Sequence, residues 1–581
     1  MLLRKLFIGV VLAVVVSAVV ASAAIGRSGA DSVTTLLLMP GVTYTREVDF
    51  TSRGPVVLDV LIAPKPDGQT YALAPALSND ALRGKETLTH LGSRVARGAT
   101  TVAIDGDYFD RITGVPNGTL MQNGVLESEP DAERSSLGIA ADGTLTTGRV
   151  SFAGIWQGKG QRRAVGLNTP AGMGRFSLYT PAYGAATPSE SGVAEAVIGK
   201  FPPAQLNEPL EGTVTAVTTT GPTTIPRGGA VLVARGRPST SQLKTEAAVG
   251  QKIVALVSLS PDWSSLASAI GGGPLLVRNG KPIFRSGESF IAGQLNSRRA
   301  RGAIGQLADG RIVLVDVEGT KPSYSIGMSN YELAVELSRL GAMTAFGLGA
   351  GSAAGIAFDG KLLTRPSNGT PRVSDALVLS YFGIYAAPPS TAVLSPNGDG
   401  VGDSESFSYR VAGLSHVDAT LAGPGGAKVT LAKAVPESPG LHALGWNGTD
   451  NGTPAPEGKW TLTVTGTDDH SVTTSAQRTF SLDDTLSSLA LTLGHHGLPT
   501  ATFQLTRSAA VLVQVQRPNG VPVVTLRSER LAAGPAKVMW RGKIGRRQAP
   551  SGRYQVAVQA TSSVGTSSLV APFSWHAHTR H

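Results

Sequence analysis

Two aspartates lie where an apolar run gives way to glycine, and carboxyl groups in such a place can do acid–base chemistry. Asp105 and Asp107 lie in the segment 102–109, which reads Val-Ala-Ile-Asp-Gly-Asp-Tyr-Phe. The apolar residues predict a strand, and the glycine lets the side chains after it turn toward a cleft. Held there, the two groups can act as acid and base, or one can act as a nucleophile. The alternative is that both aspartates only cap a turn.

A cluster of arginines further along the chain offers the opposite charge. Arg298, Arg299 and Arg301 precede a strand-like run. Because a guanidinium group can donate two parallel hydrogen bonds to a phosphate, the cluster can line a phosphate pocket. A solvated loop is the alternative. Arg372 is a second candidate for holding phosphate.

The glycine-rich run Leu-Gly-Ala-Gly-Ser, which starts at Leu348, is a candidate anion-binding loop. Glycine permits close approach of a ligand to the backbone, so the N–H groups of this run can face an anion. The candidate binding residues are Gly349, Gly351 and Ser352.

Histidine and cysteine chemistry is effectively excluded from the first two thirds of the chain. His90 is the only histidine before residue 387, and the 581 residues include no cysteine. One histidine can assemble neither a zinc site nor the relay of a Ser-His-Asp hydrolase. Without cysteine there is no disulfide framework and no thiolate nucleophile, so packing alone must stabilise the fold.

One oxygen-rich loop is a tentative calcium site. The run from Ser395 reads Ser-Pro-Asn-Gly-Asp-Gly-Val-Gly-Asp and places oxygen ligands among glycines, as calcium loops do. It lacks the closing glutamate of an EF-hand, and a plain Asn/Asp-Gly turn is the alternative. The candidate ligands are Asn397, Asp399 and Asp403; no cofactor is expected to be required. A C-terminal histidine cluster, His576, His578 and His581, is expected to be a disordered tail.

The elements that must position these residues are mostly strands. One helix is clear: it begins after Ser329, an N-cap with Glu332 as its capping-box partner, and stops at Gly341. The Asp359-Gly360 pair predicts a hairpin turn. Strand-like runs recur at 56–62, 101–104, 229–234, 252–258, 312–317 and 376–382. The pattern predicts a strand-rich α+β domain at 44–386.

After a proline-containing linker at 386–390, the chain repeats itself. Trp446-Asn447-Gly448 and the run 455–460 recur as Trp540-Arg541-Gly542 and 549–554, each 94 residues later. A period near 95 residues with short strands predicts two all-β immunoglobulin-like sandwiches, at 387–485 and 486–581. Without a cysteine pair they are not of the antibody kind. The pattern resembles the Ig-like domain of flagellar hook-capping proteins, which indicates a module type and no flagellar function.

The N-terminus predicts export. Arg4 and Lys5 precede an apolar stretch, and Ala21-Ser22-Ala23 offers a cleavage site, so residues 1–24 are expected to be a signal peptide. An uncleaved N-terminal membrane anchor is the alternative, because the stretch is about as long as a membrane span. A spacer at 25–43 follows, and the protein is expected to be secreted, extracellular or cell-wall associated.

The positive charge of the chain is concentrated at its end. The formal net charge is +10, and from Ser487 onward there are 11 Lys or Arg residues against one acid, Glu529. On an exported protein such a module attracts anionic wall polymers or lipid heads through forces that salt weakens. A merely solubilising charge is the alternative. Nucleic acid is not expected, because export and the lack of interleaved aromatic residues argue against it.

Several of these segments, in their order, resemble the phosphodiester glycosidase family. Bacterial secreted members typically read Arg-Thr-Ala-Ile-Gly, then Gly-Met-(Ser/Thr), Leu-Asp-Gly-Gly-Gly-Ser, and Pro-Ser-(Asp/Asn)-Gly with a nearby arginine. Upstream they carry a strand end with Asn-Gly-(Gly/Asp)-Tyr-Phe. The matching segments here are 105–109, 116–119, 301–305, 327–329, 348–352 and 366–369, with Arg372.

Two departures from the family pattern concern carboxylates. The family's aspartate falls on Gly349, and position 105 is Asp where Asn is usual. Either the chain keeps the fold without turnover, or Asp105 supplies the charge that Gly349 cannot.

The resemblance implies hydrolysis of sugar 1-phosphodiester bonds, in cell-envelope glycans or polysaccharides. Such a reaction needs a carboxylate near the anomeric carbon and cations around the leaving phosphate. The catalytic residues implied are Asp105, Asp107, Arg301 and Glu318, and the substrate-binding residues are Asn117, Arg298, Gly349, Gly351, Ser352 and Arg372. The alternative is a catalytically impaired wall-polymer binder or scaffold.

Overall fold

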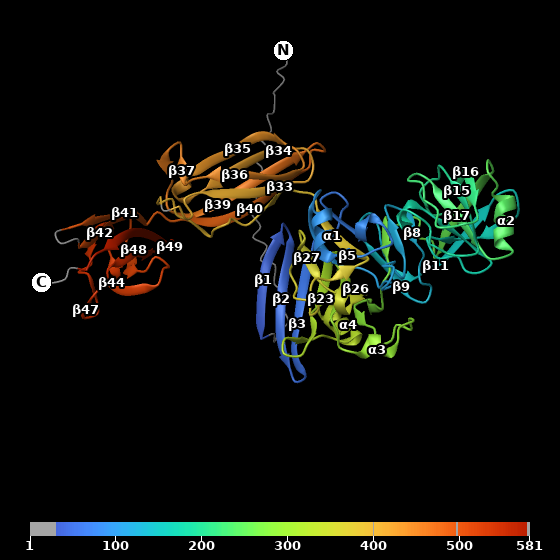
Figure 1. Cartoon of the computed structure of the whole chain (residues 1–581), viewed down its shortest axis with the longest axis horizontal. Coiled ribbons are helices and arrows are strands. Elements are labelled where there is room, and N and C mark those ends of the chain that lie inside the picture. Colours follow the sequence, from blue (N-terminus) through green and yellow to red (C-terminus); the bar gives the residue numbers. More distant parts are fainter. Residues whose placement is uncertain (1–30, 399, 495–497, 578–581) are drawn as a thin grey trace, which may run out of the picture.

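An antiparallel eight-stranded sheet forms one wall of the first domain in the computed structural model, which describes residues 31–398, 400–494 and 498–577 (Figure 1). The predicted signal peptide, Asp399, His578 and His581 lie outside the described residues. The strand order is β1 (Ser32–Met39), β2 (Val42–Thr51), β3 (Gly54–Ala63), β23 (Ile312–Val317), β22 (Arg301–Leu307), β26 (Ala342–Ala350), β20 (Leu275–Arg278) and β21 (Lys281–Pro282). No helix among the described residues is both long and apolar enough to cross a membrane.

A five-stranded sheet packs against this wall and carries the two predicted aspartates. Its order is β28 (Lys361–Leu362), β27 (Ile356–Phe358), β6 (Thr100–Asp105), β30 (Asp375–Tyr381) and β4 (Tyr71–Leu77). Leu61, Ile304 and Leu377 belong to the core between the two sheets. Because β6 and β30 are antiparallel, the end of β6 at Asp105 lies beside the start of β30, where Asp375 stands.

Helices cover the outer faces of both sheets. The predicted helix is confirmed as α4 (Asn330–Arg339): Ser329 caps it, Glu332 completes the capping box, and Gly341 follows with a φ of +90°. On the other side, α1 (Leu88–Val95) packs against the five-stranded sheet through Leu88 and Leu91. The Asp-Gly turn is also confirmed, since Asp359 has a φ of +46° between β27 and β28.

Residues 151–260 form a lobe (Figure 1). The runs at 229–234 and 252–258 predicted two of its strands, but the sequence did not predict a separate lobe. Trp156, Leu178, Leu232 and Val257 lie in its core, which is separate from the core between the two sheets. Its sheet has the order β12 (Arg163–Ala164), β11 (Ser151–Gln157), β18 (Lys252–Ser260), β16 (Leu210–Thr218), β15 (Val193–Ile198), β17 (Ala230–Arg235), β14 (Arg175–Tyr179) and β13 (Gly166–Leu167), with α2 (Ser239–Glu246) beside it.

A smaller five-stranded sheet connects the lobe to the rest of the domain. Its order is β10 (Leu145–Arg149), β9 (Ser135–Ile139), β19 (Ser268–Ile270), β7 (Leu120–Gln122) and β8 (Val125–Ser128). β9 and β19 lead toward the segment after Asp107, so this sheet also borders the candidate site.

The two C-terminal regions are β-sheet units built in the same way. The first has a three-stranded sheet of β31 (Tyr385–Ala386), β33 (Glu405–Val411) and β36 (Gly440–Trp446), and a sheet of β32 (Val393–Leu394), β40 (Thr473–Leu482), β39 (Gly458–Asp468), β34 (Ser415–Ala422) and β35 (Lys428–Glu437). The second has β41 (Leu486–Leu493), β42 (Pro499–Leu505) and β45 (Gly534–Met539), and a sheet of β44 (Pro522–Leu531), β43 (Ala509–Gln516), β48 (Gly552–Thr561) and β49 (Thr566–Trp575).

The repeated tryptophan motif makes the same contacts in both units. Trp446 packs on Trp460 with ring centroids 4.9 Å apart, and Trp540 packs on Tyr554 at 5.4 Å. Each tryptophan donates its indole N–H to a carbonyl three residues later, at 2.8 and 2.9 Å. The predicted 94-residue repeat is therefore also a structural repeat.

Candidate functional site

Asp107 and Asp375 form an acid pair at the edge where β6 ends and β30 begins. The backbone N–H of Asp107 donates to Asp375 Oδ1 at 2.7 Å. The Asp107 carboxylate accepts from Gly118 N at 2.7 Å and Tyr108 N at 2.6 Å. Asp107 and Asp375 are 3% and 0% exposed. The chain therefore brings a carboxyl predicted from the sequence next to one that was not predicted.

Burial raises the pKa of both members of the acid pair, and the charge of Asp375 adds to the rise for Asp107. Burial raises the pKa of Asp375 to about 7. Burial, followed by the charge of Asp375, raises the pKa of Asp107 well above its usual range, and the hydrogen bonds from Gly118 and Tyr108 only partly oppose this. Two close carboxyls that cannot both ionise easily retain a proton near neutral pH. Such a pair can both donate and accept a proton.

Glycines leave the space that the acid pair occupies. A side chain at Gly106 would place its Cβ 2.0 Å from Asp375 Oδ1, and one at Gly271 would place its Cβ 2.3 Å from Asp107 Oδ2. The glycine between Asp105 and Asp107 is therefore required by the neighbouring carboxyl.

Asp105 lies behind the acid pair, in a space bordered by two other glycines. Its Oδ1 accepts from Gly355 N at 3.2 Å, and its Oδ2 has no hydrogen-bond partner among the described residues. Burial raises the pKa of Asp105 well above its usual range. A side chain at Gly349 would place its Cβ 2.6 Å from Asp105 Oδ2. Asp105 therefore fills the space toward which a carboxylate at position 349 would point.

Arg301 is a buried cation held by backbone carbonyl groups. It is 2% exposed and donates to Met328 O at 2.7 Å, Gln294 O at 2.7 Å and Ser297 O at 2.8 Å. No carboxylate of the described residues lies within ion-pair distance of it, and burial lowers its pKa to about 10. A buried cation without a carboxylate partner is suited to attract an anionic ligand.

Tyr108 connects the carboxyls to two arginines. Burial raises the pKa of Tyr108 to about 12; the positive charges of Arg301 and Arg134 oppose that rise, and Asp107 and Asp105 add to it. The guanidinium group of Arg134 lies 5.6 Å from the centre of the Tyr108 ring. Tyr108 thus has both acidic and cationic groups near it.

A second group of buried acids continues along the eight-stranded sheet. Asp59 and Asp316 are paired across β3 and β23, and burial raises the pKa of each well above its usual range. Arg46 forms ion pairs with Asp59 at 3.0 Å and with Glu318 at 2.9 Å. Glu318, a predicted catalytic residue, also accepts from Arg365 N at 2.8 Å, so its carboxylate is held in a local network.

Other predicted binding residues are dispersed. Arg298 forms an ion pair with Glu332 beside α4 and donates to Gly327 O at 3.1 Å. Arg372 is exposed on β29 (Arg372–Val373) and donates to Lys85 O at 3.0 Å. Asn117 is exposed but lies at the cleft beside Asp107.

Two N–H groups of the glycine-rich loop donate to backbone carbonyl groups of the protein. Gly349 N donates to Gly106 O at 2.6 Å, and Gly351 N donates to Ala300 O at 2.9 Å, so these N–H groups already have partners. Ser352 is exposed in the 3-10 turn Gly351–Ala353.

In the loop at 395–403, Asp403 is used by the backbone of the loop itself. Its two carboxylate oxygens accept from Gly398 N and Gly400 N, each at 2.7 Å. Asn397 donates to Ser395 Oγ at 3.3 Å. These are the contacts of an Asx-type turn; calcium at this loop stays a prediction.

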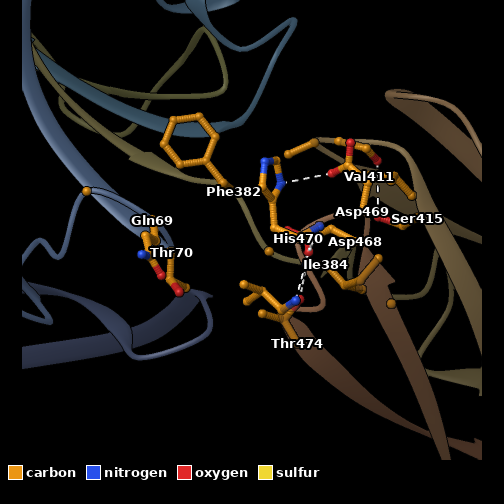
Figure 2. Close-up of a pocket in the computed structure, with 16 residues that line it drawn as sticks. Gln69, Thr70, Phe382, Ile384, Val411, Ser415, Asp468, Asp469, His470 and Thr474 are labelled. Carbon is orange, nitrogen blue, oxygen red and sulfur yellow. Dashed lines mark hydrogen bonds and ion pairs between the residues drawn. The ribbon is translucent and has the colours of Figure 1, made fainter.

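One cavity lies away from the acid pair, between the first domain and the first C-terminal unit. Its volume is about 520 Å³ (Figure 2). Gln69 and Thr70 face it from one side, and His470 and its neighbours Asp468 and Asp469 face it from the other. Asp468 Oδ1 accepts from His470 N and Val472 N at 3.0 and 2.8 Å, so this acidic turn is occupied by its own backbone.

Asp375 and Arg134 are the members of the site that sequence reasoning missed. Asp375 begins an apolar run, Asp-Ala-Leu-Val-Leu, and a single acid at the start of a buried strand was the available signal. Arg134 follows Asp131 and Glu133 in a stretch without strand periodicity, so only its position in space reveals it.

Comparison with known proteins identifies part of the chain. The family model described as phosphodiester glycosidase matches residues 205–380. The match places a phosphodiester glycosidase domain around residues 205–380. The match includes Arg301, Glu318, Gly349 and Asp375, while Asp105 and Asp107 precede it.

Some known proteins are similar to parts of this chain. The SPbeta prophage-derived uncharacterized protein YomE of Bacillus subtilis (strain 168) is 34% identical over 107 residues, which are 18% of this chain and 16% of YomE. A hypothetical protein from Synechocystis of known structure is 26% identical with a TM-score of 0.51, covering 61% of this chain and 65% of that one. The matches thus span less than two thirds of either relative.

A second similar structure belongs to a Burkholderia pseudomallei K96243 protein provisionally described as exported. It is 23% identical with a TM-score of 0.47, and the match covers 58% of this chain and 77% of that one.

Proposed function

We propose that the protein hydrolyses a sugar 1-phosphodiester, with Asp107 acting at the anomeric carbon. The observation that carries this proposal is the buried acid pair of Asp107 and Asp375, with Arg134 and Arg301 near the same tyrosine, in a chain with a phosphodiester glycosidase domain. Glycosyl transfer to water needs carboxyl groups at the anomeric centre, and the departing phosphate needs cations. Both kinds of group meet here.

The reaction breaks the bond between the anomeric carbon and the phosphate oxygen. The bonding electrons leave with the phosphate, which departs as a phosphomonoester held by Arg134 and Arg301. The hydroxyl of a water molecule is added to the anomeric carbon, and the acid pair takes the remaining proton. Because a phosphomonoester is a good leaving group, Asp375 needs only to share a proton with Asp107 and hold it in place.

We assign Asp105 the role of the carboxylate missing from position 349. Its Oδ2 has no hydrogen-bond partner in the part of the chain that the structure describes, and it lies 2.6 Å from where a Cβ at residue 349 would be. Gly349→Asp alone should therefore crowd Asp105 and lower activity, because two buried carboxyls would share one space. The double change Asp105→Asn with Gly349→Asp should recover activity, because it restores one carboxylate and one neutral side chain.

The test is phosphomonoester release from a glycosyl 1-phosphodiester by the purified full-length protein. Loss of turnover in Asp107→Asn supports the proposal. Absence of turnover in the natural chain, with turnover in the double exchange at 105 and 349, supports the rival function: a catalytically impaired glycan-binding protein. The observation that favours this rival is that Gly349 lacks the family carboxylate.

We also propose that the protein is exported and that its last unit attaches it to an anionic cell-wall polymer. The alternation of apolar strands and the Trp contacts support an immunoglobulin-like sandwich for each C-terminal unit. The last unit carries nearly all the excess positive charge. Retention on cell-wall preparations that salt reverses supports this attachment; retention unaffected by salt contradicts the electrostatic cause.

A further inference from the structure

One segment of the chain, residues 286–297, crosses the candidate site and is called the strap. It connects β21 to β22 and contains the short helix α3 (Ala292–Asn296). Phe290 of the strap packs against Tyr108, with ring centroids 5.7 Å apart. The strap therefore contacts the ring that has both acidic and cationic groups near it.

The carboxylate of Glu288 in the strap is held by two backbone N–H groups. Its Oε1 accepts from Leu275 N at 2.7 Å and its Oε2 accepts from Ser135 N at 2.9 Å. Leu275 begins β20 and Ser135 begins β9. A Cβ at Gly273 would lie 2.8 Å from Oε2, so glycine leaves room for the anion. A phosphate can be held in the same way, with two of its oxygens each accepting a hydrogen bond from a backbone N–H group.

The strap also accepts hydrogen bonds from both arginines that the proposed function assigns to phosphate. Arg134 lies over Phe290 at 4.5 Å and donates from Nε to Ser289 O at 3.3 Å. Arg301 donates to the strap carbonyls of Gln294 and Ser297. Ser135 N, Leu275 N, Arg134 and Arg301 thus each have an acceptor from the same twelve-residue segment. Ser135 and Arg134 also line the cleft beside Asp107.

We propose that these four donors form the binding site for the phosphate group of the substrate, and that Glu288 occupies it as an internal anion. The strap must move before a phosphodiester can bind, because the donors cannot serve both anions. The inference rests on the proposed function for the identity of the substrate. Its anion-binding part does not depend on turnover.

The experiment measures binding of inorganic phosphate to the full-length protein by isothermal titration calorimetry. Glu288→Gln keeps the size of the side chain but removes the charge that competes with phosphate. We expect it to tighten the dissociation constant for phosphate about tenfold or more, since hydrogen bonds to charged groups are the strong ones and like charges repel. Adding Arg134→Gln to this variant should remove the gain.

Phe290→Leu is the matched control, because it loosens the aromatic contact of the strap and keeps the Glu288 carboxylate. If Glu288→Gln increases the affinity for phosphate well above the increase in Phe290→Leu, the result supports competition by the carboxylate. Equal gains in the two variants overturn it, as does an unchanged phosphate affinity in Glu288→Gln. A second Glu288 variant, Glu288→Ala, should show the same gain; if both Glu288 variants melt like the natural protein but bind no phosphate, the anion site is refuted.

Activity measurements separate this inference from the proposed function. If Glu288→Gln binds phosphate more tightly but no variant releases a phosphomonoester, the anion site stands and the proposed hydrolysis fails. If the natural protein hydrolyses the phosphodiester and Glu288→Gln changes neither phosphate affinity nor KM, the hydrolysis stands and the strap inference fails.

Discussion

The two cationic regions of this protein hold their charges in opposite ways. Arg301 in the candidate site is 2% exposed, and three backbone carbonyl groups fix its guanidinium group. In the last C-terminal unit, a hairpin at 541–547 exposes four cations: Arg541, Lys543, Arg546 and Arg547. The buried region fixes the direction of its hydrogen bonds and the exposed region does not. The first can select one anion, whereas the second can attract many.

The corresponding hairpin of the first C-terminal unit shows that the charge is separable from the fold. Residues 447–453 follow Trp446 as 541–547 follow Trp540, and both segments form a two-stranded hairpin. The first segment contains one acid and no cation, yet the tryptophan contacts are the same. At the candidate site no such separation is possible, because the charged groups are themselves part of the packing.

The largest effect is expected at Asp107. Asp107→Asn keeps the shape of the side chain and removes the carboxylate, so kcat should fall about 10³-fold or more. The measurement is phosphomonoester release at saturating substrate, with the melting temperature recorded for each protein. Asp142→Asn, at an exposed carboxylate that pairs with Lys65, is the control and should leave kcat unchanged. Equal turnover by Asp107→Asn and the natural protein would remove Asp107 from catalysis.

The next effect is the pH dependence of stability caused by Asp375. Its pKa of about 7 in the folded protein lies above the ordinary value of about 3.9. The folded state therefore binds this proton more tightly, so its contribution to stability is full below about pH 4 and is lost as the pH rises to about 7. Relative to Asp375→Asn, the natural protein should lose on the order of 3 kcal/mol across that window.

Urea unfolding at several pH values measures this difference. The free energies of unfolding of the natural protein and Asp375→Asn must be subtracted at each pH. Burial raises the pKa of Glu127 to about 7 as well, so Glu127 contributes to the pH dependence of both proteins. Parallel curves for the two proteins between pH 4 and 7 would show that Asp375 does not hold a proton in the folded state.

Arg301→Lys is expected to lower kcat/KM about 10²-fold, which is comparable to the loss of one fixed donor in an enzyme site. A single ammonium group cannot reach all three carbonyls that the guanidinium group reaches, so the cation loses its direction. Arg372→Lys is the comparison, since Arg372 is exposed and was the second candidate for holding phosphate by sequence. If the two variants lose the same activity, burial does not distinguish the two arginines.

Sequence reasoning predicted several elements of the fold and some residues of the candidate site. The capping box at Ser329, the Asp-Gly turn at 359 and the tryptophan repeat were predictable because each depends on residues close in sequence. Asp107 was predictable for the same reason. Asp375 was not, because it meets Asp107 only through the pairing of β6 with β30, across 268 residues. The lobe at 151–260 was missed because its short strands pair in a non-sequential order.

The smallest effect is expected from removing the exposed charges of the hairpin. Changing Arg541, Lys543, Arg546 and Arg547 together to Gln should weaken binding of the full-length protein to an anionic cell-wall preparation about tenfold at low salt. It should change the free energy of unfolding by little, because exposed substitutions away from packed groups each contribute within about 0.5 kcal/mol. The variant keeps Ile544 and Trp540, which pack in the core of this unit.

Salt separates the hairpin from the buried site. Binding of the natural protein to the wall preparation should weaken steadily as salt is added and converge on that of the four-Gln variant, because ions screen exposed charges. Phosphate binding to Glu288→Gln should weaken much less over the same range, since Arg301 is buried. If both kinds of binding depend equally on salt, the two regions attract anions by the same long-range force, and burial does not make Arg301 selective.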